Sequence, residues 1–116
     1  MSEDTIFHQI MRREIPAEIV HEDEHMIAFR DIAPQAPVHV LFVPKKTIRG
    51  LDAAGTDDAE MIGRLALAAA EYARAEGLAK KGYRIVMNCN EEGGQTVFQM
   101  HLHLLAGAPL GRFGAP

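Results

Sequence analysis

VFQMHLHLL, residues 97–105, is the stretch that decides how the rest of the chain is interpreted. Apolar and polar side chains alternate along it, and the side chains of a β-strand point alternately to its two faces. One face would carry Phe98, Met100, Leu102 and Leu104. The other face would carry Val97, Gln99, His101 and His103. We therefore predict a strand over residues 97–105 that covers a core with its first face and presents an amide and two imidazoles on its second.

The flanking sequence predicts two helices and four more strands. Apolar residues at helical spacing predict a short helix over residues 5–13, which Ile15-Pro16 ends, and a longer helix from the N-cap Thr56 to Gly77. Hydrophobic runs predict strands at residues 19–21, 26–30, 38–43 and 83–89, and the two prolines of residues 31–37 predict a loop. Short connections between most strands favour an α+β fold with an antiparallel sheet, in one domain over residues 1–116.

Composition narrows the class of protein. Twelve Lys and Arg against 16 Asp and Glu give a net charge of −4, which argues against a strongly basic nucleic-acid binder. Cys89 is the only cysteine, so an internal disulfide and a zinc site of paired cysteines are excluded. No apolar run reaches the roughly 18–20 residues of a membrane span, and residues 1–14 do not have the pattern of a signal peptide. A cytoplasmic protein without membrane or nucleic-acid partners is expected.

The polar face of residues 97–105 allows three interpretations. It could be the solvated side of a half-exposed sheet, a site of phosphate chemistry, or a metal site. A metal would use His101 and His103 with His39 or a carboxylate as the third ligand, but no residue lies at a diagnostic spacing. Residue types alone leave these alternatives open, and no metal or cofactor is predicted.

Several separated segments resemble the histidine triad (HIT) family, in its Hint-like branch of purine nucleoside phosphoramidases. GGQTVFQMHLHLL at residues 93–105 resembles the family signature, in which His alternates three times with apolar residues. DIAPQAPVH at residues 31–39, followed by VPKK at 43–46, resembles a second segment, and DTIF, REIP and GYR at residues 4–7, 13–16 and 82–84 match as well. The resemblance implies an antiparallel sheet of about five strands with two helices, assembled as a homodimer.

The resemblance also implies a reaction and a nucleotide site. His101 would attack the α-phosphorus of a nucleoside phosphoramidate or acyl-adenylate, and water would release AMP or GMP from the nucleotidyl-His101 intermediate. His103, Thr96 and the backbone around Gly94 and Gln95 would contact the phosphate. Asn88 would bind the sugar-phosphate region and Asp31 both ribose hydroxyls. The remaining nucleotide-binding residues would be Val97 and an apolar purine slot formed by Phe7, Ile10, Phe29, Ile32 and Leu41.

Gln99 departs from the family signature, because it stands where the first His is expected. We include it among the catalytic positions with His101, His103 and Thr96, yet a primary amide does not exchange a proton near neutral pH. Amine leaving groups would then be activated poorly. Two functions stay open: a hydrolase of purine nucleotide conjugates, or a nucleotide-binding module that has lost turnover. Ala108 and the tail over residues 110–116 are further departures that could affect substrate preference.

The other histidines are expected to have simpler roles. His8, His21 and His25 are predicted to be solvated. His39 lies within the strand at residues 38–43, and it would be either a partner of the active-site histidines or a buried, hydrogen-bonded imidazole.

Overall fold

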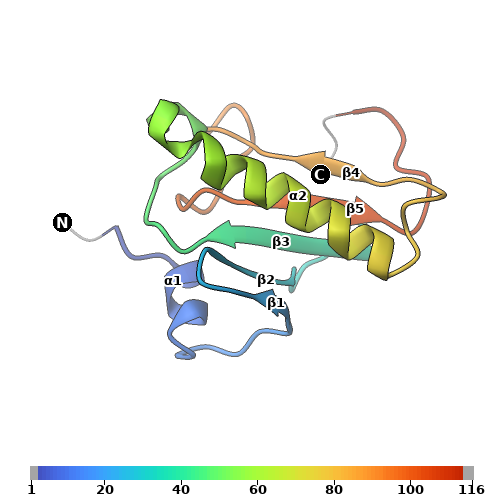
Figure 1. Cartoon of the computed structure of the whole chain (residues 1–116), viewed down its shortest axis with the longest axis horizontal. Helices are drawn as coiled ribbons and strands as arrows, with labels where there is room; N and C mark the ends of the chain where they lie inside the picture. The colour runs from blue at the N-terminus through green and yellow to red at the C-terminus, as the bar shows by residue number, and fades with distance from the viewer. Residues whose placement is uncertain (1–2, 114–116) are drawn as a thin grey trace.

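The computed structural model describes residues 3–113 and contains one five-stranded sheet and two α-helices (Figure 1). The strands are β1 (Ile19–Glu22), β2 (Met26–Arg30), β3 (Val38–Pro44), β4 (Arg84–Val86) and β5 (Leu102–Ala106). Their order is β1-β2-β3-β5-β4, and each neighbouring pair is antiparallel. The predicted α+β fold is confirmed, and β5 lies between β3 and the edge strand β4.

The two helices lie on opposite faces of this sheet. Helix α2 (Ala59–Ala75) packs Leu65 and Ala69 against Phe42 of β3 and Leu104 of β5. Helix α1 (Ile6–Met11) packs on the face that carries Phe29 and Leu41, beside β1 and β2 (Figure 1). The register aligns Leu41 with His103, so this histidine projects from the α1 face. Among residues 3–113, neither helix has the length and apolarity needed to cross a bilayer.

Helix α1 begins with a reciprocal cap that involves a buried histidine. The Thr5 hydroxyl accepts a hydrogen bond from Phe7 N at 3.1 Å, and His8 Nδ1 accepts one from Thr5 N at 2.9 Å. Because Nδ1 accepts, the proton of a neutral ring lies on Nε2, which is 3.2 Å from the Thr47 hydroxyl. The prediction that His8 is solvated was wrong, since the side chain is only 8% exposed. His21 and His25 are exposed, as predicted.

The predicted final strand is correct at its end and wrong at its start. Residues 97–101 are irregular, and β5 begins at Leu102. The reason is that Met100 N donates to Ile48 O at 2.8 Å, outside the sheet ladder. Phe98 stacks under the Arg49 guanidinium at 4.1 Å from its ring centre, whereas Met100, Leu102 and Leu104 do enter the core.

Other boundaries also differ from the predicted ones. Residues 56–58 form a 3₁₀ turn, because the Asp58 carboxylate accepts a hydrogen bond from Gly55 N, and α2 starts only at Ala59. Strand β4 covers residues 84–86 of the predicted 83–89, and β3 extends through Pro44. Of the tail over residues 110–116, residues 114–116 lie outside the described part of the chain.

The core between α2 and the sheet depends on Phe42, which is fully buried and makes an edge-on contact with Tyr72. We expect Phe42→Ala to lower the free energy of unfolding in urea by about 3–5 kcal/mol, from lost burial and a residual cavity. Glu71→Ala, at an exposed position of α2, should change it by less than about 0.5 kcal/mol. Equal effects of the two substitutions would contradict this account of the core.

Candidate active site

His101 lies just before β5, and its ring makes one hydrogen bond and edge-on contacts with the rings of Phe7 and His103. Its Nδ1 is 2.7 Å from the backbone oxygen of Gln99. A carbonyl oxygen only accepts, so Nδ1 carries the proton and Nε2 of the neutral ring carries the lone pair. The residue is 5% exposed, and Phe7 meets its ring edge-on at 5.0 Å between ring centres. The His101 ring is therefore fixed with its lone pair on Nε2.

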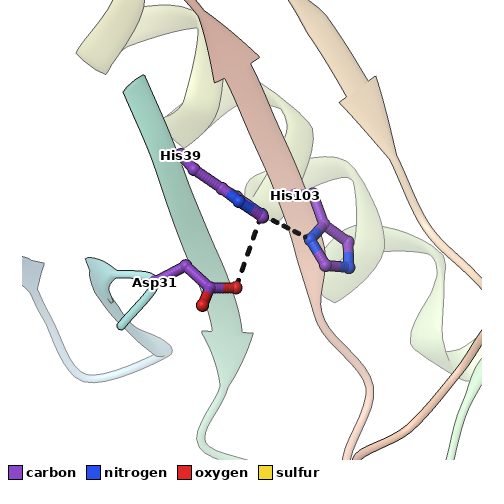
Figure 2. Close-up of side chains that lie close together, drawn as sticks. All are labelled: Asp31, His39 and His103. Carbon is purple, nitrogen blue, oxygen red and sulfur yellow. Dashed lines mark hydrogen bonds and ion pairs between the residues drawn. The ribbon is translucent and has the colours of Figure 1, made fainter. Parts of the chain in front are cut away.

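His39 on β3 and His103 on β5 form a line of directed hydrogen bonds (Figure 2). Gln35 N donates to His39 Nδ1 at 3.0 Å, so the proton of His39 lies on Nε2. That atom is 2.9 Å from His103 Nδ1 and 3.5 Å from an oxygen of Asp31. Since His103 Nδ1 accepts, its proton lies on Nε2. These two bonds, from Gln35 to His39 and from His39 to His103, form a hydrogen-bonded relay. They leave the Nε2–H group of His103 free to donate to a further acceptor.

Burial keeps these histidines neutral. Loss of solvation lowers the pKa of His101, and the bond to the Gln99 carbonyl only partly offsets this effect. Burial, reinforced by the neighbouring His101 and His39, lowers the pKa of His103 to about 4. Burial also lowers the pKa of His39, against the opposing charge of Asp31. Near pH 7 the site therefore holds neutral imidazoles and a free lone pair for nucleophilic attack.

Asp31, His39 and His103 are also close enough to be considered as metal ligands, because one ligand atom of each lies within 4.8 Å of the others. A metal bound to a neutral imidazole needs a nitrogen lone pair. In His39, Nδ1 already accepts from the Gln35 amide and Nε2 carries the proton. The observed bonds fit a hydrogen-bonded relay and leave His39 without a lone pair for a metal.

The turn before residue 97 carries the residues expected to meet the phosphate. The N–H groups of Gly94 and Gln95 donate within the turn, to Glu91 O and Asn90 O, each at 3.0 Å. The Gln95 amide is buried and holds Asn90 N, Arg49 O and Val97 O. Thr96 is exposed, and the Asn88 side chain lies beside Gly94. A side chain at residue 94 would be strained by its φ of +91°. Thr96 is thus exposed, whereas the Gln95 side chain and the N–H groups of Gly94 and Gln95 are already hydrogen-bonded within the protein.

The apolar residues expected in a purine slot separate into two groups. Phe7, Ile10, Phe29 and Leu41 belong to the core cluster under α1, with exposures of 3–6%, and Val97 packs against that cluster. Ile32, in contrast, is 95% exposed in the loop after β2. Asp31 beside it is held by a bond from Ala33 N to Oδ1 at 2.8 Å. Phe7 of this cluster contacts the His101 ring, whereas Ile32 extends into solvent and the Asp31 carboxylate is directed at His39 (Figure 2).

Gln99 does not occupy the predicted place on the open face. Its side chain is fully buried; Nε2 donates to Pro44 O at 3.0 Å and Lys46 O at 2.7 Å, and Oε1 accepts from Ile48 N at 3.0 Å. Only its backbone oxygen reaches His101. The expectation that this side chain shares an open face with His101 and His103 is therefore wrong, because the amide is fully buried and does not meet substrate.

Sequence reasoning also missed the residues that orient the histidines. Gln35 and the 44–48 turn act through backbone groups, and backbone groups leave no residue-type signal in a sequence. The one available signal was that His39 closely follows residues 31–37 in the sequence, the segment that contains its hydrogen-bonding partner Gln35.

Comparison with known proteins fits this site. The family model described as HIT domain matches residues 12–110. The chain is 48% identical to the purine nucleoside phosphoramidase of Escherichia coli K12, over 96% of this chain and 93% of that protein. It is 53% identical to an uncharacterized HIT-like protein of Synechococcus elongatus, over 95% of this chain and 96% of that protein. A HIT family hydrolase from Legionella pneumophila superposes with a TM-score of 0.93 at 44% identity, covering 97% of this chain and 100% of the other. This chain belongs to the HIT family.

Proposed function

We propose that this protein hydrolyses purine nucleoside 5′-phosphoramidates and acyl-adenylates through a nucleotidyl-His101 intermediate. The observation that carries the proposal is the fixed, neutral His101 ring, whose Nδ1–H is committed to Gln99 O and whose Nε2 lone pair is free to attack. The neighbouring His103 supplies an N–H donor for an anion. The name of the Escherichia coli relative supports the same class of substrate.

In the first step, the Nε2 lone pair of His101 forms a bond to the α-phosphorus while the bond to the leaving group breaks. His103 Nε2–H donates to a non-bridging phosphate oxygen, and the Gln99 carbonyl stabilises the positive charge that develops on the His101 ring. A carboxylate departs with its electron pair, whereas an amine must also gain a proton, which it takes from water. Water then attacks the phosphorus as the bond between phosphorus and His101 Nε2 breaks, a proton of this water passes to solvent, and the nucleoside monophosphate leaves with the lone pair of His101 restored. Asp31 accepts from the ribose hydroxyls and Ile32 covers the purine.

The reaction also predicts that acyl-adenylates turn over faster than phosphoramidates. A leaving amine must take its proton from water, because burial keeps the histidines of the site neutral near pH 7, and assistance by a positioned acid is typically worth about 10²–10⁴-fold.

A homodimer is part of the proposal. Strand β4 is an edge of the sheet, and Ile85 on it is 44% exposed. Leu67 of α2 is 66% exposed. Edge strands and apolar surfaces of this kind are usually covered. We propose that β4 and α2 pair with the same elements of a second copy.

The first test measures turnover of adenosine 5′-phosphoramidate and formation of a covalent adduct by intact mass. We expect His101→Ala to lower kcat by about 10³-fold or more and to abolish the adduct, because the nucleophile is lost. His21→Ala removes an exposed histidine and should retain the parent's activity. Nucleotide binding by the parent without turnover or adduct would identify a binding module instead.

The pH dependence follows from the neutral ring. His101 attacks only when unprotonated, and its pKa is lowered by burial. Activity is therefore complete above the ordinary histidine pKa of about 6.5 and is lost only as the pH falls through a lower value. A profile of kcat/KM between pH 4 and 8 checks this, and an acid limb at or above about 6.5 would contradict it.

The proposed dimer is tested by mass in solution at micromolar concentration. We expect the parent chain to have the mass of a dimer and Ile85→Lys to have that of a monomer, because the charge would be buried at the β4 edge. Leu51→Lys changes an exposed apolar residue of a 3₁₀ turn and should leave the dimer intact. A monomeric parent would rule out this assembly.

A further inference from the structure

The side chain of Gln99 ties together two segments that are distant in the sequence. Its amide donates to Pro44 O and Lys46 O and accepts from Ile48 N, so its partners are the last residue of β3 and the segment that follows it; we call residues 44–48 the 44–48 turn. Met100 N adds a bond to Ile48 O at 2.8 Å. The backbone of residues 99 and 100 is therefore fixed relative to residues 44–48.

The backbone of the same residue holds the nucleophile. Gln99 O is 2.7 Å from His101 Nδ1, and this bond places the ring proton on Nδ1. A carbonyl that moved away would allow the proton to occupy Nε2, where it would block attack. The bonds of the Gln99 side chain thus bear directly on which nitrogen of His101 is nucleophilic.

The 44–48 turn is itself anchored from the other side. His8 of α1 bonds to the Thr47 hydroxyl, and Phe7, the preceding residue, contacts the His101 ring edge-on. Residue 99 and α1 both contact the His101 ring, and both are attached to the 44–48 turn. Through this turn, the ring and its hydrogen-bond acceptor, Gln99 O, are fixed relative to each other.

We propose that Gln99 is a positioning residue: its buried amide locks the 44–48 turn and thereby holds its own carbonyl oxygen where it keeps the proton of His101 on Nδ1. This inference rests on the proposed function and deepens it. The side chain at position 99 then has no part in proton transfer to the leaving group. It must instead supply the hydrogen-bond donors and acceptor that the 44–48 turn needs.

That pattern distinguishes the possible side chains. The site needs donors for two carbonyl oxygens and an acceptor for one N–H, and a primary amide supplies all three. A neutral imidazole has one donor and one acceptor, so histidine would satisfy part of the pattern. Methionine has a similar length and supplies none of it, which would leave buried polar groups unpaired.

The experiment compares the full-length parent with Gln99→Met, Gln99→His and Leu65→Ala. Ring-nitrogen ¹⁵N shifts of histidine-labelled protein report the tautomer, with the His101 signals assigned through His101→Asn. Turnover of adenosine 5′-phosphoramidate and an acyl-adenylate is measured in parallel. Leu65 is fully buried on the α2 face of the sheet, so Leu65→Ala controls for destabilisation of the core while it removes none of the hydrogen bonds of residues 44–48.

We expect the parent and Leu65→Ala to show His101 protonated on Nδ1. Gln99→Met should lose that single tautomer and lower kcat for both substrates by a common factor of about 10–100, as when a partner that orients a catalytic ring is removed. Gln99→His should keep the tautomer and most of the turnover, and it serves as the decisive variant if Gln99→Met does not fold.

Three results would overturn the proposal. The first is a parental tautomer in Gln99→Met, the second is an equal loss of tautomer in Leu65→Ala, and the third is a Gln99→His enzyme that is faster on the phosphoramidate but not on the acyl-adenylate. If the parent hydrolyses neither substrate, the proposed function fails, while the ¹⁵N comparison still decides the role of Gln99.

Discussion

The hydrogen bond between His101 Nδ1 and the Gln99 carbonyl is the interaction on which the rest of this site depends. A neutral imidazole has one proton for two nitrogens, and only a fixed acceptor decides which nitrogen keeps the lone pair. Fixing that acceptor requires the Gln99 amide, and fixing the ring requires Phe7 behind it. Many of the hydrogen bonds under the α1 face therefore serve to hold Gln99 O and the His101 ring in place.

The site is suited to an anion although its histidines carry no charge near pH 7. Burial lowers the pKa of each of them, and the nearby Lys45 and Lys46 are paired with Glu22 and Asp58. An anion would therefore be attracted by directed N–H groups, above all by the Nε2–H group of His103. A neutral ring keeps His101 nucleophilic, whereas a permanent cation at His103 would disfavour the positive charge that attack places on His101. An arriving phosphate strengthens the N–H bond, because hydrogen bonds to charged acceptors are stronger than neutral ones.

The sequence predicted the elements whose apolar residues form a run or recur at helical spacing. Apolar runs at residues 26–30 and 38–43 predicted two strands, and helical spacing after residue 59 predicted the long helix, because burial selects apolar residue types at these positions. It failed at residues 97–101 and at His8, where side chains bond to backbone or hydroxyl groups 39–55 positions away. Such bonds have no period, and a polar residue buried by them has the same appearance in the sequence as one exposed to solvent.

The three alternating positions of the signature are consequently not equivalent. In the proposed reaction His101 and His103 act through ring nitrogens, whereas residue 99 turns its side chain into the protein and acts through its backbone oxygen. The acidity of the side chain then matters at positions 101 and 103, and its set of donors and acceptors matters at position 99. Glutamine lacks a titratable proton, yet it satisfies two carbonyls and one N–H within a fully enclosed space. The replacement of histidine at position 99 is therefore compatible with an intact nucleophile, because the property that the site needs there is hydrogen bonding and not proton exchange.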